Sequence, residues 1–253
     1  MNSLYANPKY YEIAFSYRDI PQEVRTMQEI IRRFSLVPVK SVLEFGCGNS
    51  PHMEELMNHG YSYVGLDLSR EMLNYSQSKA KKLGGHAKLV WADMVDFELE
   101  QPVDFAYTML GSLYVKNTKQ LLSHFECAHA NLMPGGLYLL DWCVDFTCLA
   151  DTQDAWLVEQ DDIAIYVRYH TRSLNFIEQT VDETIELTID DNGTTRRLTH
   201  NNIRRAIYPQ EFLLISHKVG FEFIGWWNNW DLTAPLTGKE TEVNRAIAVL
   251  RAR

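Results

Sequence analysis

The chain has 253 residues and a hydrophobic fraction of 46%, enough to bury the core of one large α/β domain with an elaboration, but not two independent domains. Lys and Arg total 24 against 33 Asp and Glu, so the formal net charge is -9. A surface of that sign repels a phosphate backbone. We therefore expect no nucleic-acid partner.

The first residues contain no positive segment followed by an apolar one, and no apolar run approaches the roughly 20 residues that span a bilayer. We therefore expect a cytoplasmic protein with no membrane partner. Cys47, Cys127, Cys143 and Cys148 form no Cys-x-x-Cys pair, which indicates reduced thiols. His124 and His129 are five residues apart, off the spacing that puts two ligands on one helical face, so we expect no metal site.

The first 150 residues alternate between strand and helix patterns. Apolar residues between Pro21 and Phe34 recur at helical spacing, and Pro21 suits the first turn of a helix. A short apolar strand at 40–45 then breaks into a glycine turn before a second helical stretch. Further strands are predicted at 61–66, 87–91, 103–108 and 137–142, with a helix capped by Ser69 and another at 119–132. Repeated units of this length predict a mostly parallel sheet with helices on both faces.

The pattern changes beyond Asp151. The stretches 163–174, 177–189 and 194–207 are rich in Thr, Ile, Val and Tyr, and Asp191-Asn192-Gly193 is a hairpin signal, so we expect an antiparallel insertion after the fifth strand. A helix at 209–219, ended by Gly220, and strands at 221–227 and 244–250 return the chain to the sheet. The predicted organisation is an N-terminal aromatic segment and helix (1–35), a core (36–150), the insertion (151–207) and closing elements (208–253).

The turn after the first strand predicts a nucleotide-type site. Gly46 and Gly48 let backbone N–H groups approach a ligand at a helix N-terminus, although such a turn also serves nicotinamide and flavin enzymes. Asp67 ends the second strand about 20 residues further on, where a carboxylate can bind ribose hydroxyls of NAD or of S-adenosylmethionine. Pro51 occupies the third glycine position of the NAD motif and argues against NAD. Glu44 suits a cationic amino-acid tail better than a pyrophosphate.

Four motifs in order resemble those of class I S-adenosylmethionine-dependent methyltransferases: Glu44-Phe45-Gly46-Cys47-Gly48, Gly65-Leu66-Asp67-Leu68-Ser69, Trp91-Ala92-Asp93-Met94 and Leu132-Met133-Pro134-Gly135-Gly136. The resemblance implies a Rossmann-like sheet of seven strands with S-adenosylmethionine as the cofactor. It also implies that Asp67 binds ribose, that Asp93 accepts from the adenine amino group and that Met109 and Leu110 lie near the sulfonium. The other cofactor-binding residues expected from it are Glu44, Gly46, Cys47, Gly48, Leu68, Met72, Ala92 and Met94.

The N-terminal segment is unusually aromatic and resembles the lid of glycine and amino-sugar N-methyltransferases. Its members are Tyr5, Tyr10, Tyr11, Phe15 and Tyr17, followed by Arg18. By this resemblance, Tyr11, Tyr17 and Arg18 reach the cofactor, and Arg18 pairs with its carboxylate. The alternative is an amphipathic helix that packs its rings on the domain.

Those relatives also carry a β-rich insertion that roofs the acceptor. Here it brings Arg168, His170, Arg172, Arg204 and Arg205, any of which could hold an anionic acceptor, although alternate residues of a half-exposed strand are usually solvated. No histidine follows the fourth strand, so Tyr114 is the nearest polar candidate there. We expect Tyr114 and Tyr17 as the catalytic residues.

The function predicted from the sequence is methyl transfer from S-adenosylmethionine to a small-molecule acceptor, by N- or O-methylation through in-line displacement. The alternatives are a catalytically silent protein that binds the cofactor or a partner and, less favoured, an NAD-dependent oxidoreductase. We expect a monomer or a homodimer.

Overall fold

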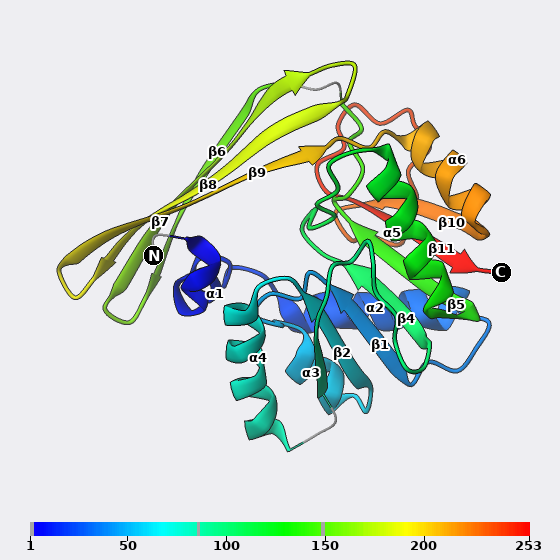
Figure 1. The fold of residues 1–253 in the computed structure, drawn as a ribbon, viewed down its shortest axis with the longest axis horizontal. Coiled ribbons are helices and arrows are strands. Elements are labelled where there is room, and N and C mark those ends of the chain that lie inside the picture. Colours follow the sequence, from blue (N-terminus) through cyan, green and yellow to red (C-terminus); the bar gives the residue numbers. More distant parts are fainter. Residues whose placement is uncertain (1–2, 85–86, 148–149) are drawn as a thin grey trace.

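The computed structural model describes residues 3–84, 87–147 and 150–253. It contains a seven-stranded sheet and a separate four-stranded antiparallel sheet (Figure 1), which confirms the predicted fold class. The large sheet has the strand order β10-β11-β5-β4-β1-β2-β3. Its strands are β1 (Ser41–Phe45), β2 (Ser62–Asp67), β3 (Ala87–Trp91), β4 (Val103–Thr108), β5 (Leu132–Asp141), β10 (Phe221–Asn228) and β11 (Ala246–Ala252).

Strand direction in the large sheet sets the position of the site. Neighbours among β3, β2, β1, β4 and β5 pair in parallel, whereas β11 is antiparallel to both β5 and β10. The carboxyl ends of the five parallel strands therefore meet at one edge. In open α/β sheets this edge is where ligands bind.

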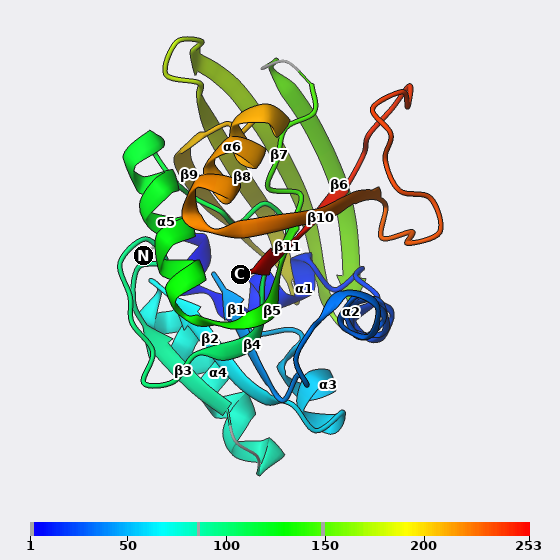
Figure 2. The ribbon, with the colours of Figure 1, turned by 90° about the vertical axis from the view of Figure 1, so that its right-hand side faces the viewer.

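Helices cover both faces of the large sheet. Figure 2 shows α5 and α6 on one side and α2 and α3 on the other. The predicted cap of α4 is confirmed, since the Ser69 side chain accepts a hydrogen bond from the Met72 N–H, and Gly220 ends α6 with a φ of 114°. The helices are η1 (Leu4–Ala6, a 3₁₀ turn), α1 (Pro8–Ala14), α2 (Ile20–Phe34), α3 (Met53–Asn58), α4 (Arg70–Leu83), α5 (Thr118–Ala130) and α6 (Pro209–Val219).

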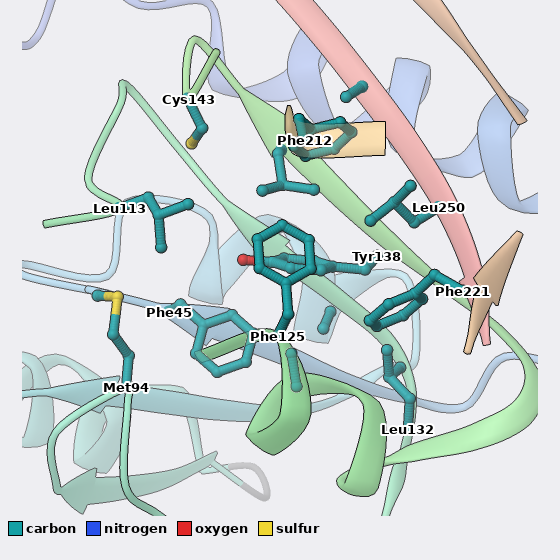
Figure 3. Packing of buried hydrophobic residues seen from close by; sticks show 14 of the residues in the cluster. Phe45, Met94, Leu113, Phe125, Leu132, Tyr138, Cys143, Phe212, Phe221 and Leu250 are labelled. Atoms are coloured by element: carbon teal, nitrogen blue, oxygen red, sulfur yellow. The ribbon is translucent and has the colours of Figure 1, made fainter. Parts of the chain in front are cut away.

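Two hydrophobic clusters hold these helices to the sheet. On the α5 and α6 side, Phe45, Phe125, Tyr138 and Phe221 pack edge to face or tilted against their neighbours (Figure 3), with ring centroids 5.5 to 6.3 Å apart. On the other side, residues of α2, α3 and α4 cover the alternate side chains of β1, β4 and β5. Burial on both faces explains why these strands read as continuous apolar runs.

The start of β5 differs from the prediction of a turn at Pro134-Gly135-Gly136 after a helix ending at Leu132. The strand begins at Leu132, and the turn residues lie within it as an irregularity. Val103 pairs with Leu132, but Phe105 pairs with Leu137. A bulge therefore absorbs the extra residues, with Gly135 in the left-handed region at φ 88°.

The four-stranded sheet contains one strand that the sequence analysis did not predict, β6. The strands are β6 (Thr152–Gln160), β7 (Ile163–Asn175), β8 (Thr180–Asp191) and β9 (Thr194–Arg205). In Figure 1 this sheet extends away from the large sheet as a long twisted ribbon, with α1 beside it.

Helix α1 supplies the apolar cover of that sheet. Leu4, Tyr10, Ile13 and Ala14 form a third hydrophobic cluster with the inward side chains of β7, β8 and β9. The Trp156 indole N–H donates to the Ala14 carbonyl at 2.8 Å. The aromatic segment is thus an amphipathic helix packed on the inserted sheet. We refer to η1, α1 and β6–β9 together as the cap.

Cys47, Cys127 and Cys143 are free thiols, while Cys148 lies outside the described residues. Among the helices of the described ranges, none has the length and apolar character that crossing a membrane requires.

Candidate functional site

The glycine turn joins β1 to the following helix and is held by Asp67. Gly46 and Gly48 have φ values of 60° and 50°, which favour glycine. Asp67 Oδ2 accepts the Gly48 N–H at 2.7 Å, and Oδ1 accepts the Ser69 N–H at 2.7 Å. Burial raises the pKa of Asp67, and these two backbone hydrogen bonds oppose the rise. The carboxylate at the end of β2 therefore fixes the turn after β1.

A cavity of about 250 Å³ opens beside this turn. A methyl group at Gly46 would come within 3.3 Å of the Ser112 Cβ, whereas one at Gly48 would meet open space. The turn is therefore shaped so that backbone, rather than side chains, borders the cavity. The expected cofactor-binding residues that line it are Tyr11, Arg18, Glu44, Gly46, Cys47, Gly48, Met109 and Leu110.

Glu44 lies at the floor of this cavity in a buried hydrogen-bond network. The hydroxyls of Tyr63 and Tyr107 both donate to its Oε2, and His52 Nδ1 lies 3.2 Å from its Oε1. On the other side of the ring, His52 Nε2 is 2.9 Å from Glu23 Oε2. Because a carboxylate only accepts, these two contacts favour donation from both ring nitrogens and hence the imidazolium form of His52, whereas Arg18 Nη2, 3.1 Å from the same Nε2, opposes it.

The electrostatics of His52 agree with this assignment. Burial alone would lower its pKa, but the charge of Glu44 and the hydrogen bonds to Glu23 and Glu44 raise it. Burial opposes ionisation of Glu23, yet hydrogen bonds and charge from His52 and Arg18 lower its pKa to about 2. These contacts therefore favour the charged forms of Glu23 and His52.

Arg18 lines the cavity but already has a partner. Its Nη2 lies 2.5 Å from Glu23 Oε2, and its Nε donates to Glu23 Oε1 at 3.3 Å. Its expected pairing with the cofactor carboxylate stays a prediction, because in this structure the guanidinium is held by α2.

The structure does not bring the remaining expected cofactor residues into this cavity or into the larger one described next. They lie at or just after the carboxyl ends of β2 and β3 and are Asp67, Leu68, Met72, Ala92, Asp93 and Met94. Leu68 is 60% exposed, while Met72 and Met94 are buried. Asp93 accepts the Val95 N–H at 3.2 Å, a turn contact that leaves its expected role toward adenine a prediction.

A second cavity, of about 620 Å³, lies between the cap and the large sheet. Tyr11, Phe15, Leu110 and Ser112 line both cavities, so the two adjoin there. Its walls come from the aromatic segment, the loop after β4, the segment after β5, the inserted sheet and the loop before β11. A space of this size suits a small organic molecule.

Asp141, at the end of β5, fixes the junction between the cavities. Its side chain is fully buried, and its Oδ2 accepts the N–H of Leu110 at 2.8 Å. Leu110 has a φ of 51°, a left-handed conformation that leucine rarely adopts. Arg245 donates to both oxygens of Asp141, at 2.8 and 2.7 Å, and to Glu23 at 3.1 Å. The loop after β4 is therefore tied to α2 and to the last strand.

Glu183 is a site residue that sequence reasoning missed. It is 7% exposed and lines the larger cavity. Its Oε1 accepts the Tyr114 hydroxyl at 2.9 Å, and its Oε2 accepts the Tyr169 hydroxyl at 2.9 Å and Arg204 Nε at 3.0 Å. The signal was present in the sequence, since Glu183 falls on the apolar alternation of Val181 and Ile185 in β8.

The two expected catalytic tyrosines both line the larger cavity, in different surroundings. Tyr114 donates to Glu183, and burial raises its pKa well above the ordinary value, so it keeps its proton at neutral pH. Tyr17 is 59% exposed at the rim, where burial also raises its pKa and its ring lies 5.9 Å from that of Trp156. Their catalytic roles remain predictions.

Residues 42–136 match the family model described as a methyltransferase domain. Over 126 residues the chain is 29% identical to dTDP-3-amino-3,4,6-trideoxy-alpha-D-glucopyranose N,N-dimethyltransferase of Streptomyces venezuelae, covering 49% of this chain and 51% of that protein. Over 197 residues it is 27% identical to tRNA U34 carboxymethyltransferase of Vibrio atlanticus, covering 72% and 58%. The chain thus spans about half the length of the curated relatives it matches.

The fold is shared over almost the whole chain with a solved S-adenosylmethionine-dependent methyltransferase from Clostridium acetobutylicum. The TM-score is 0.78 at 15% identity, over 96% of each chain. Residues 42–136 thus match a methyltransferase domain, and the chain has the class I methyltransferase fold.

Proposed function

We propose that this protein is an S-adenosylmethionine-dependent methyltransferase that acts on a small molecule, by N- or O-methylation. The observation that carries the proposal is the junction of two cavities at Leu110, one beside the glycine turn and one beneath the cap. A cofactor held in the first would present a reactive group to an acceptor held in the second.

The residues beside the glycine turn fit this cofactor. Gly46 and Gly48 leave backbone at the cavity wall, where a side chain on Gly46 would collide with Ser112. Glu44 lines the cavity and offers a carboxylate to the cationic amino group of the methionine part. A contact of Asp67 with the ribose rests on the sequence resemblance, since Asp67 holds the turn but lines neither cavity. Pro51, in place of the third glycine, disfavours NAD.

When bound, S-adenosylmethionine supplies a methyl carbon activated by its positive sulfur. The chain has to align the acceptor at Leu110 and to exclude water there. Tyr11 and Phe15 line both cavities and present apolar rings at the junction. The residues shared by the two cavities would hold the acceptor lone pair in line with the methyl carbon, opposite the bond to sulfur that would break with its electron pair left on sulfur.

A small molecule is favoured over nucleic acid as the acceptor, although one relative is named for tRNA. The net charge of -9 opposes a phosphate backbone, and the larger cavity is enclosed by the cap. A cytoplasmic location and a monomeric or homodimeric state remain predictions.

The first test is calorimetric titration with S-adenosylhomocysteine and, separately, with NAD. We expect saturable binding of S-adenosylhomocysteine alone, lost in Asp67→Ala and kept in Asp162→Ala, which changes an exposed carboxylate in the β6–β7 turn. Failure of the folded protein to bind S-adenosylhomocysteine would overturn the proposal. Binding without transfer of labelled methyl groups to any small amine or alcohol would favour the catalytically silent alternative.

A further inference from the structure

The charged residues of the larger cavity are unbalanced. Among the described residues that line it, Asp145, Asp154 and Glu183 are carboxylates, and Arg204 is the one cationic side chain. An anionic acceptor would therefore depend on Arg204. Whether that guanidinium can bind a ligand follows from its contacts.

Arg204 is already engaged with two carboxylates. Its Nη1 and Nη2 donate to Asp145 at 3.1 and 3.3 Å, and its Nε donates to Glu183 at 3.0 Å. Burial would lower its pKa, but the charges of Asp145 and Glu183 raise it, so the group stays charged. With two carboxylates around one guanidinium, this part of the wall is net negative.

The other basic residues of the inserted sheet lie elsewhere. Tyr169 and Thr171 line the cavity, so the alternate residues Arg168, His170 and Arg172 are on the opposite face of β7. Arg168 pairs there with Glu186 at 3.6 Å and Arg172 with Asp182 at 3.5 Å.

Arg205 is bound outside the cavity, where its Nη2 donates to Glu211 at 2.6 Å and to Gln179 at 2.8 Å. Of the five basic residues that could hold an anionic acceptor, Arg204 is the one that lines the cavity, and it is engaged with Asp145 and Glu183.

The remainder of the wall suits a cation. Eight aromatic side chains line the cavity; besides Tyr114 and Tyr169, which hydrogen-bond to Glu183, six present rings that attract a nearby ammonium group. They are Tyr5, Tyr11, Phe15, Tyr17, Trp142 and Trp156. Glu183 Oε1 accepts one hydrogen bond among the described contacts, from Tyr114, and a carboxylate oxygen has room for a second.

We propose that the acceptor is a protonated amine that carries no phosphate or carboxylate group, bound by Glu183 and the aromatic wall. The inference rests on the proposed function. It separates this chain from the Streptomyces venezuelae relative, whose name specifies a dTDP-linked substrate. The ammonium group releases one proton to water through the cavity mouth, the freed lone pair takes the methyl group, and the product is a methylated ammonium ion.

The test compares one amine with and without a phosphate. Glucosamine and glucosamine 1-phosphate are titrated into the complete protein saturated with S-adenosylhomocysteine, and dTDP is added as a competitor. We expect glucosamine to bind at least about tenfold more tightly than its 1-phosphate, the effect of one charge-assisted contact, and dTDP not to compete. Equal binding of the two sugars, including failure of both to bind, overturns the inference, as does competition by dTDP.

A matched pair of variants tests the role of Arg204. The isosteric double change Asp145→Asn with Glu183→Gln leaves the guanidinium without carboxylate partners, so dTDP affinity should rise about tenfold and the preference for glucosamine should vanish. Arg172→Gln, on the outer face of β7, should change neither the affinity for dTDP nor the preference for glucosamine over its 1-phosphate. If the double variant does not fold, Glu183→Gln alone should still weaken glucosamine binding. Retained binding of S-adenosylhomocysteine in these variants separates a failed inference from a failed proposed function.

Discussion

The large sheet and the cap are assembled in different ways. In the large sheet, the glycine turn and the carboxylate that holds it, Asp67, lie within one strand–helix–strand unit. In the cap, Ile13 and Ala14 of α1 share a cluster with Ile165, Ile185 and other residues of strands some 150 positions later in the sequence. The cofactor side is therefore built locally, and the acceptor side depends on long-range packing. A change in the cap can alter the acceptor cavity while the glycine turn stays intact.

The largest loss of stability should come from an ion-pair network within the large-sheet region, where Arg245 joins Asp141 of β5 to Glu23 of α2. Arg245→Met leaves the buried carboxylates of Asp141 and Glu23 without their half-buried cationic partner, and removing the partner of a buried charge costs about 3–5 kcal/mol in the free energy of unfolding. Urea denaturation followed by circular dichroism measures it. Arg32→Met, in an exposed pair with Glu29, is the control and should leave the midpoint unchanged. Equal midpoints for the two variants would contradict the structural role of Arg245.

Removal of a buried side chain from the core of the cap should affect the acceptor side and leave the cofactor side unchanged. Ile165 is fully buried between the inserted sheet and α1, so Ile165→Ala should lower the free energy of unfolding by about 2–5 kcal/mol. At temperatures where the variant is folded, acceptor KM should rise while the affinity for S-adenosylhomocysteine is kept. Leu214→Ala, at a 70% exposed position of α6, serves as the control and should change stability by less than about 0.5 kcal/mol. Parallel loss of cofactor affinity would show that the two sides are not separable.

A change in the glycine turn should have the reverse effect, weakening the binding of the cofactor rather than that of the acceptor. Gly46→Ala puts a methyl group 3.3 Å from Ser112 Cβ in a left-handed conformation, which costs about 1–2 kcal/mol of stability. We expect S-adenosylhomocysteine to bind about tenfold more weakly, equivalent to about 1.4 kcal/mol. Gly60→Ala shares the positive φ but meets no neighbour within 4 Å, so it should lose stability and keep cofactor affinity. Calorimetry measures the affinity of both variants for S-adenosylhomocysteine. Equal affinities would show that the glycine turn is not part of the cofactor site.

The smallest effect is a pH dependence set by His52. Because folding raises its pKa, the stability it contributes is full below pH 6.5 and is lost as the pH rises through the folded value. Glu23, with a pKa of about 2, stays charged throughout that range. The free energy of unfolding of the wild type should therefore fall, relative to that of His52→Gln, as the pH rises above 6.5. Parallel curves for the two proteins would mean that His52 is not an imidazolium in the folded state.

The same contrast explains what could be predicted from the sequence. The glycine turn, the Ser69 cap and the alternation up to β4 depend on residues close together in the chain, so their spacing carries the information. Glu183 and Asp141 acquire their surroundings from segments far away, such as Arg204, Trp230 and Arg245. The residue pattern within one strand carries no information about partners that come from other segments of the chain.

The packing of the cap also decides which basic residues of the insertion face the cavity. Strand alternation predicts that Arg168 and Arg172 share a face, but not which face meets the cavity, because that depends on where α1 packs. Helix α1 covers the face of Ile165 and Val167, and this leaves the arginines on the other side. The aromatic segment, expected as a lid, thereby also determines the orientation of the inserted sheet.

The packing of α1 on the inserted sheet sets an order of events during biosynthesis. Leu4, Tyr10 and Ile13 leave the ribosome early, but the strand residues that bury them, beginning at Ile163, follow about 150 residues later. At 5–20 residues per second that interval is on the order of ten seconds. Until then Glu12 can bind Tyr75 and Lys79 of α4, but the apolar face of the nascent helix lacks the strands that bury it, which makes that face a natural point of attachment for chaperones that bind short apolar segments.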